Sequence, residues 1–501
     1  MGGVSKGVSK LQVGRGAVYL FVENISSMLL GYAFWLILSR MTSPDIVGVS
    51  SSLISFAIII ISIASIGVPL GVQRFLGKIF LEKRFEDAMV FVKSSFLIVS
   101  LGLTASMIII SVSSYLVFDQ FRFILVVVSM ILIVASTISM LLRSIIIASL
   151  NTKKVLLAST ISSATKLFVV IVLLSFGTEE VGVLIAFTVT PLIASVILAF
   201  DVNTLLKKAK KRTFIKFSES LRSLLKASVA SWIPLSIETI GAQLGTIIVL
   251  GIQGSTQAGF YFIAFQLSMG LSAVIWAIEG TTYPALSSME DGRKRFVWRT
   301  IKVSLIILLP ISFAIIFYST DITQLFGYSY SEGAPALQIL LLSVVPNAVM
   351  NGIGILTYAY GNYRHVLIIG IASTVPRLLL YFVFVPWFGG TGAALSYTLG
   401  AIFGFIASVV ISKRIGLIIR WKEIVLMAAV PLMLALLFSS LNVHFVLGIM
   451  LSILISYVIY LKLMLIDRKD VRDYLYILPV NIANPLIRMV DSIAKKINGR
   501  Y

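Results

Sequence analysis

Long apolar stretches recur along the whole chain, and short polar segments separate them. Fourteen of these stretches reach about the 20 residues that a helix needs to cross a bilayer. They cover residues 17–39, 46–72, 88–112, 123–142, 155–175, 181–200, 227–250, 259–285, 300–318, 335–359, 364–386, 391–411, 424–441 and 443–466. The pattern predicts an all-α, polytopic membrane protein with about 14 transmembrane helices.

The positive charges alternate between successive loops. With the spans placed as above, 36 of the 41 Lys and Arg residues fall on one side of the membrane, and only Arg40 and Arg122 on the other. The remaining three, Lys93, Lys166 and Arg377, lie inside spans. Cytoplasmic loops of membrane proteins carry an excess of cations. We therefore expect a multi-pass protein of the cell membrane with both termini in the cytoplasm.

The composition excludes several classes of protein. Hydrophobic residues make up 58% and charged residues 12% of the 501 residues, which is unlike a soluble enzyme. The net charge of +20 lies mostly in the cytoplasmic loops, so we expect contact with anionic lipids and no nucleic-acid partner. The chain has no cysteine and two distant histidines, His365 and His444, so we expect no metal site. No loop is long enough for an ATPase or glycosyltransferase domain, and we expect neither enzymatic activity nor a cofactor.

The basic segment 201–226 divides the spans into sets. The predicted organisation is a six-helix lobe, a basic cytoplasmic linker, a second six-helix lobe, two additional transmembrane helices and a cytoplasmic amphipathic tail. The corresponding boundaries are 1–200, 201–226, 227–415, 416–466 and 467–501. The tail pattern fits a helix lying on the inner membrane surface, and a frayed tail fits it equally well.

The two six-span sets share local sequence features. Asn151 begins one segment and Asn362 the other, and 15 residues later follow Lys166-Leu167 and Arg377-Leu378. A Phe-Gly pair then follows in both, at 176–177 and at 388–389. Both sets start on the same side of the membrane, so the repeat is parallel. Internal repeats are typical of secondary transporters, whose substrate site lies between the halves.

Two cations lie near the middle of spans, at matching positions of the repeat. Lys166 and Arg377 are each roughly 15 Å from either surface at 1.5 Å per residue, too far to reach it easily. One interpretation is a pair of cations that line a water-filled cavity and face an anionic substrate. The other is a structural ion pair with a buried carboxylate. Arg74 ends the second span, where it either anchors the helix at the interface or forms the cytoplasmic mouth of the cavity.

Two acidic residues also lie within spans. Glu238, with Gln243 about one turn further on, either pairs with Lys166 or Arg377 or carries a coupling proton. Glu23, next to Asn24, lies about two turns inside the first span. We treat these four residues as candidates for ion coupling or charge pairing.

Several local motifs carry a resemblance to a known family. They are Gly-Ala-Val-Tyr-Leu at 16–20, Leu-Ser-Arg-Met-Thr-Ser-Pro-Asp at 38–45, Ile-Gly-Val-Pro-Leu-Gly-Val-Gln-Arg at 66–74 and Gly-Gly-Thr-Gly-Ala-Ala at 389–394. With its fourteen spans, the chain resembles the MOP flippase superfamily, specifically its polysaccharide transporter (Wzx-type) branch. The resemblance implies a V-shaped, MATE-like bundle of two six-helix lobes that works by alternating access.

The same resemblance implies a substrate. It would be a polyprenyl-(pyro)phosphate-linked oligosaccharide, moved from the cytoplasmic to the outer leaflet for polysaccharide or glycoprotein biosynthesis. Lys166 and Arg377 fit the cationic cavity of that family by residue type and depth. The implied partners are membrane lipids and other glycan-assembly membrane proteins, and we expect a monomer.

A related branch of the superfamily provides the alternative. A MATE-type multidrug or small-molecule antiporter would use Glu23 or Glu238 as a proton or sodium site and would favour an acidic cavity. Two cations in mid-span would repel cationic drugs, which weighs against this alternative.

Overall fold

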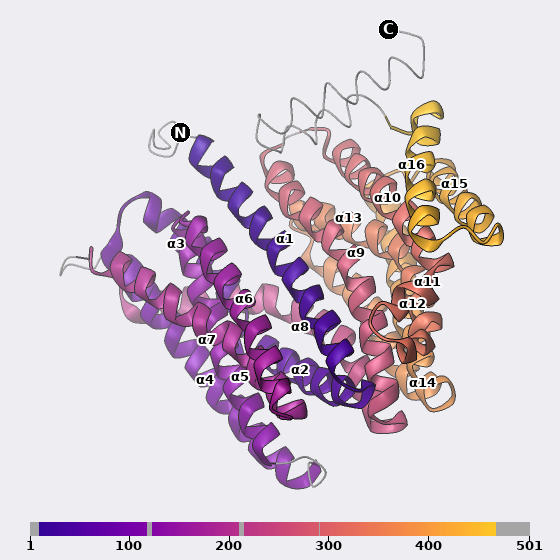
Figure 1. Cartoon of the computed structure of the whole chain (residues 1–501). Coiled ribbons are helices and arrows are strands. Elements are labelled where there is room, and N and C mark those ends of the chain that lie inside the picture. Colours follow the sequence, from indigo (N-terminus) through magenta and orange to yellow (C-terminus); the bar gives the residue numbers. More distant parts are fainter. Residues whose placement is uncertain (1–9, 118–122, 210–214, 290, 467–501) are drawn as a thin grey trace. The chain divides into compact units, whose positions relative to one another are not determined.

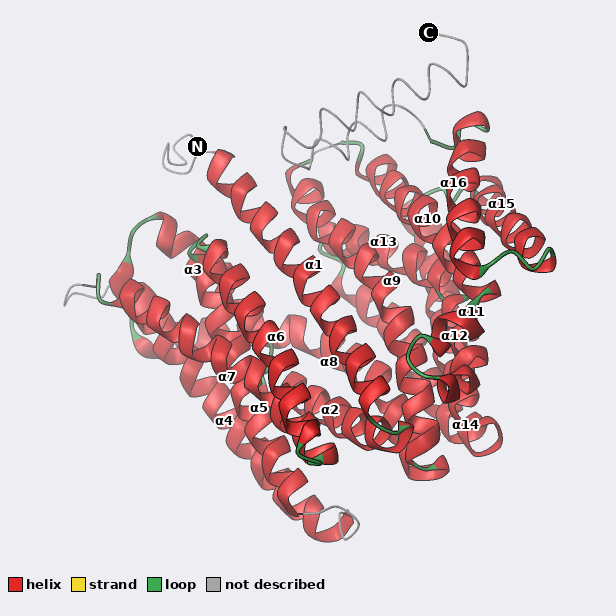
Figure 2. Ribbon diagram, viewed as in Figure 1, coloured by secondary structure: helices red, strands yellow, loops and turns green. Residues whose placement is uncertain are grey.

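The structure is a computed structural model that describes residues 10–117, 123–209, 215–289 and 291–466. Within these residues every regular element is a helix, and no strand occurs (Figure 2). The all-α prediction is therefore confirmed. The predicted tail 467–501 lies outside the described residues.

The chain folds as two compact units, the first ending at Ile247 and the second beginning at Ile248 (Figure 1). The first unit contains seven helices and most of an eighth. They are α1 (Lys10–Met41), α2 (Pro44–Ala64), α3 (Val68–Leu81), α4 (Phe85–Val117), α5 (Phe123–Ala148), α6 (Thr152–Ser175), α7 (Glu179–Leu206) and α8 (Phe217–Gln253). Helix α8 begins in the first unit and ends in the second.

The second unit contains the remaining elements. They are α9 (Ser255–Ser288), α10 (Arg293–Phe317), α11 (Ser319–Gln324), the 3₁₀ helix η1 (Tyr328–Gly333), α12 (Ala334–Leu341), α13 (Val344–Ala359), α14 (Tyr363–Ile415), α15 (Trp421–Ser440) and α16 (Phe445–Lys462). The division into five segments predicted from the sequence stays a prediction. At both ends of the predicted linker, however, the chain is helical, because α7 extends to Leu206 and α8 begins at Phe217.

Each of the fourteen predicted spans coincides with a helix, a helix pair or an arm of a helix. Among the described residues, eleven helices are long and apolar enough to cross a membrane, or twelve if the bent pair of residues 328–341 and 344–359 counts as one span. The long helix α14 counts once there, although it contains two predicted spans. The structure thus confirms a polytopic helical protein, whereas the number fourteen is approximate.

The second predicted span, 46–72, is not one continuous helix. Helix α2 ends at Ala64 and α3 begins at Val68, because Ile66 and Gly67 adopt positive φ angles of 47° and 67°. A helix cannot continue through two such residues. A Cβ on Gly67 would lie 2.6 Å from the Ser228 carbonyl oxygen of α8, so the glycine also permits close packing at this break.

Helix α8 packs along the first unit through small and polar residues. The Trp232 indole Nε1 donates a hydrogen bond of 2.9 Å to the carbonyl oxygen of Ser62, in the last turn of α2. The Ser62 and Ser236 hydroxyls are 3.1 Å apart, and Ser52 donates to the Thr246 carbonyl. Since carbonyls in the last turn of a helix lack helical partners, Trp232 compensates for the early end of α2.

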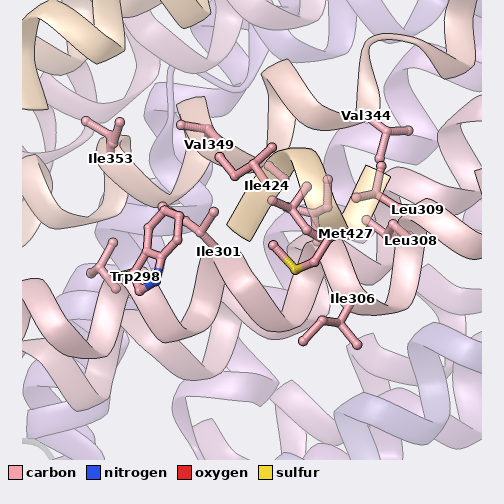
Figure 3. Packing of buried hydrophobic residues seen from close by; sticks show 14 of the residues in the cluster. Trp298, Ile301, Ile306, Leu308, Leu309, Val344, Val349, Ile353, Ile424 and Met427 are labelled. Atoms are coloured by element: carbon pink, nitrogen blue, oxygen red, sulfur yellow. The ribbon is translucent and has the colours of Figure 1, made fainter. Parts of the chain in front are cut away.

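The core of the second unit forms around α10. Figure 3 shows Trp298, Ile301 and Leu308 of α10 packed among side chains of α13 and α15. An ion pair joins α10 to α15, with 3.4 Å between Lys302 Nζ and a Glu423 oxygen. The Tyr460 hydroxyl of α16 donates to the Met427 carbonyl of α15. The two helices that follow the second set of six spans are therefore docked on the body of this unit.

Helix α14 is a hairpin of two helical arms. At Gly389 the backbone leaves the helical region, with φ 55° and ψ −133°. A Cβ on Gly400 would lie 2.6 Å from the Cβ of Arg377, so residues at similar distances on either side of Gly389 lie against each other. The Gln253 side-chain amide donates to the Val385 and Pro386 carbonyls, which lie next to the bend.

Candidate functional site

Lys166 lies on α6 and is buried, with 7% of its surface exposed. Its ammonium nitrogen is 4.5 Å from the ring centre of Phe34 on α1 and 4.8 Å from that of Phe187 on α7. A cation over an aromatic face is attracted by the ring quadrupole. The described residues of its own unit place no carboxylate against this ammonium, so only the two rings stabilise its charge there.

Arg377 lies on the first arm of α14 and is also buried, with 3% of its surface exposed. Its guanidinium carbon is 4.1 Å from the ring centre of Tyr397 on the second arm. Its Nη2 donates a hydrogen bond of 3.2 Å to the hydroxyl of Ser373, one turn earlier. Its Nε is buried and has no hydrogen-bond partner among the described residues. The guanidinium therefore keeps an unused donor, which is costly in a buried site.

Glycines make room for the Arg377 side chain. A Cβ on Gly400 would lie 2.6 Å from the Ser373 carbonyl oxygen and 3.0 Å from Arg377 Nε. A Cβ on Gly404 would lie 2.7 Å from the Ser373 side chain. Since real Cβ atoms do not approach other atoms so closely, only glycine fits at these positions. The close spacing of the two arms thus fixes where the guanidinium lies.

The two sites occupy equivalent places in the internal repeat. In each, a cation on one helix faces a ring on the next helix, and a Phe-Gly turn separates the two, at Gly177 in one unit and Gly389 in the other. Lys166 and Arg377 are 211 residues apart in the sequence, and Phe187 and Tyr397 are 210 apart. The repeat inferred from the sequence is therefore supported by the same kind of contact in both units.

The other buried charges are compensated. Among the described side chains, three charged groups besides Lys166 and Arg377 are buried: Glu23, Asp87 and Lys302. Asp87 accepts a hydrogen bond of 2.9 Å from Arg84, and Lys302 pairs with Glu423. Lys166 and Arg377 thus differ from the rest in having no acidic partner within their own units.

Glu23 is held by two neighbouring helices. It is 5% exposed and accepts hydrogen bonds of 2.7 Å from Arg143 Nη2 on α5 and 2.8 Å from the Ser159 hydroxyl on α6. The carboxylate is therefore engaged in charge pairing, one of the two roles expected for it. Its partner is Arg143, which the charge pattern of the sequence assigned to a cytoplasmic loop.

The remaining candidates lie elsewhere in the first unit. Arg74 is exposed on α3, with its guanidinium 6.0 Å from the ring centre of Phe75. Glu238 is exposed on α8, and Gln243 is half-buried about one turn further on. Asn24 is exposed beside the buried Glu23. Glu23 of α1 and Lys166 of α6 thus lie on two helices that pack against each other. Within the described residues, Lys166 makes no contact with Glu238.

Comparisons with known proteins agree with this architecture. The model of a family described as polysaccharide biosynthesis protein matches residues 37–335. A protein of Haloferax volcanii named as a flippase, AglR, is 30% identical over 172 residues, which are 31% of this chain and 35% of that protein. A protein of Shigella flexneri named as an O-antigen transporter is 25% identical over 238 residues, 45% of this chain and 56% of that protein. The chain thus spans about a third and about half of these two relatives.

Solved structures share the fold along most of the chain. The lipid II flippase MurJ in an inward closed conformation has a TM-score of 0.59 and 16% identity, and the match covers 86% of this chain and 99% of that one. A MOP superfamily transporter from Pyrococcus furiosus has a TM-score of 0.60 and 17% identity over 83% of this chain and 99% of that one. At these identities the similarity establishes the fold alone.

The family match extends over more than half of the chain and covers helices of both units. The expected resemblance to a polysaccharide family is thereby confirmed. The chain belongs to the family of polysaccharide biosynthesis proteins and has the helical fold of the MOP superfamily.

Proposed function

We propose that the protein is a flippase, which moves a polyprenyl-(pyro)phosphate-linked oligosaccharide from the cytoplasmic to the outer leaflet by alternating access. The observation that carries the proposal is that Lys166 and Arg377 are buried cations for which the described residues of their own units provide no acidic partner. The names of the two relatives, a flippase and an O-antigen transporter, support the same class of activity.

The chemistry of such a substrate accounts for the two cations. A phosphate or pyrophosphate and its hydroxyl-rich glycan cannot cross hydrocarbon unaided, whereas the polyprenyl tail can stay in the bilayer. Lys166 provides a compact positive charge, and Arg377 provides a planar group with a free Nε donor for an oxyanion. Within its own unit each charge lies over an aromatic ring, and an anionic head group would act as the counter-ion of either charge.

The remaining functional assignments follow from this proposal. Arg74, exposed on α3, is suited to attract the anionic head group at the cytoplasmic mouth. The protein would lie in the cell membrane with both termini in the cytoplasm and would act beside other glycan-assembly membrane proteins. The site residues need no metal or cofactor for this task.

The antiporter alternative has less support from the site. Its coupling ion would bind Glu23 or Glu238. Arg143 and Ser159 already occupy both oxygens of Glu23, and Glu238 is exposed on α8. A cationic drug would also approach two uncompensated positive charges, which costs free energy in a medium of low dielectric constant.

Flipping can be tested in proteoliposomes that contain a fluorescent polyprenyl-pyrophosphate-linked disaccharide. Leaflet exchange is followed by the access of an added glycosidase to the sugar, for the wild type, Lys166→Gln and Arg377→Gln. We expect the wild type to exchange the lipid and each variant to lose at least about tenfold in rate, since a charge-assisted contact is worth roughly 1.5–3 kcal/mol.

Lys93→Gln is the matched control, because Lys93 lies in a span but is exposed. It should exchange the lipid like the wild type. If the wild type exchanges no lipid but exports a cationic dye under a proton or sodium gradient, the antiporter replaces the flippase. If exchange survives both substitutions, Lys166 and Arg377 are structural.

A further inference from the structure

Helices α1 and α6 meet at two levels. At one level, Glu23 of α1 accepts a hydrogen bond from Ser159 of α6. At the other, Phe34 of α1 lies 4.5 Å from the ammonium of Lys166, also on α6. Ser159 and Lys166 are two turns apart and on the same helix face, so the two contacts are separated by about 10 Å along α6 and by about 16 Å along α1, at 1.5 Å per residue. The Glu23 carboxylate and the Lys166 ammonium therefore lie along the same contact between α1 and α6, at different levels, and do not pair with each other.

Arg143 of α5 supplies the positive charge that pairs with Glu23. Its Nη2 donates to Glu23 Oε2 over 2.7 Å, and Ser159 donates to Oε1, so both carboxylate oxygens have partners other than Lys166. Arg143 is partly exposed, with 38% of its side chain accessible, whereas the Glu23 side chain is 6% exposed. If Arg143 were absent, Lys166 would be the nearest buried cation to Glu23 among the described side chains of these two helices.

We infer that Arg143 is a positioning residue, which compensates Glu23 and thereby leaves the positive charge of Lys166 available to an anionic ligand. The inference rests on the proposed function, because it assigns a purpose to the uncompensated charge of Lys166. Two unit charges about 10–16 Å apart in a partly buried site change an equilibrium constant by roughly tenfold. Loss of the Arg143 charge should therefore weaken anion binding at Lys166 without any change at Lys166 itself.

The test measures binding of farnesyl pyrophosphate, a soluble polyprenyl pyrophosphate, to the full-length protein in detergent by calorimetry at pH 7. Farnesol, which has the same tail and no charge, is the reference ligand. We expect Arg143→Gln to bind the pyrophosphate about tenfold more weakly. Glu23→Gln, which leaves Arg143 as an uncompensated cation, should bind it about threefold more tightly. With additive charge effects, the double variant should lie between the single variants, about threefold weaker than the wild type.

Two controls separate electrostatics from folding. Arg143→Lys keeps the charge and should bind like the wild type. Arg84→Gln removes the same charge from the other buried ion pair of this unit, with Asp87, and should also leave pyrophosphate affinity unchanged. If Arg143→Gln does not fold, Glu23→Gln still decides, because unchanged or weaker binding by that variant contradicts the inference.

The outcomes distinguish the inference from the function on which it rests. If the wild type prefers the pyrophosphate to farnesol and Lys166→Gln abolishes the preference, the anion site stands. In that case, normal binding by Arg143→Gln, or a double variant as weak as Arg143→Gln, overturns the role of Arg143 alone. If the wild type binds both ligands equally, the proposed function and the inference are both wrong.

Discussion

The Lys166 site and the Arg377 site place a buried cation at the same point of the repeat but hold it in different ways. Lys166 lies between two phenyl rings and makes no hydrogen bond to the described residues of its unit. Arg377 has one tyrosine ring and a serine hydroxyl, and its stem packs against Gly400. The position of the charge is common to both sites, whereas the surrounding groups differ.

The difference shows what each site requires. Around Lys166, the attraction of two aromatic faces stabilises a compact charge without fixing its donors in direction. Around Arg377, close helix packing and a hydrogen bond fix a planar group, so that Nε remains free in a defined direction. We therefore expect the first site to depend mainly on charge and the second on geometry.

The largest effect should come from Gly400→Ala. The added methyl group would lie 2.6 Å from the Ser373 carbonyl oxygen, and overpacking of this kind costs about 1–3 kcal/mol. The two arms of α14 must separate, which displaces Arg377. We expect a lower melting temperature in detergent and a flipping rate reduced by at least about tenfold. Gly370→Ala in the same helix meets no atom within 4 Å and should be neutral or slightly stabilising.

An exchange of the two cations should have an intermediate effect. Lys166→Arg keeps a charge between two rings that also stack on guanidinium groups, so the flipping rate should stay within about threefold of the wild type. Arg377→Lys loses the planar fork and its fixed donor, and the rate should fall by about tenfold. Equal losses in the two variants would contradict the distinction between charge and geometry.

The smallest effects should come from the rings. Phe187→Leu removes one of two aromatic faces from Lys166 and should weaken pyrophosphate binding by about threefold. Tyr397→Phe keeps the ring over Arg377 and should bind like the wild type, whereas Tyr397→Leu should not. Calorimetry on these three variants measures the contribution of each ring. A strong loss in Tyr397→Phe would show instead that the hydroxyl group, rather than the ring, is required.

The sequence pattern predicted the spans well because hydrophobic length is a property of each segment alone. It predicted both mid-span cations for the same reason, since a charge within an apolar run is visible without a structure. The break between α2 and α3 was missed, because hydropathy does not register the positive φ angles at Ile66 and Gly67.

The partners of the charges could not be found in this way. The charge pattern assigned Arg143 to a cytoplasmic loop, yet its side chain pairs with Glu23, which lies on a helix that is distant in the sequence. Phe34, Phe187 and Tyr397 resemble any other aromatic residues of a span until the folded chain places them over a cation. The 210-residue spacing of Phe187 and Tyr397 was the one available signal, because it nearly equals that of the two cations.

The hairpin form of α14 also bears on how the chain enters the membrane during synthesis. A straight helix of 53 residues would be about 80 Å long at 1.5 Å per residue, far more than the hydrocarbon thickness, so the two arms must insert side by side. A guanidinium in mid-span opposes insertion of the first arm by itself. Because Gly400 and Tyr397 lie on the second arm, the insertion machinery would release both arms into the lipid together, with Arg377 already enclosed between them.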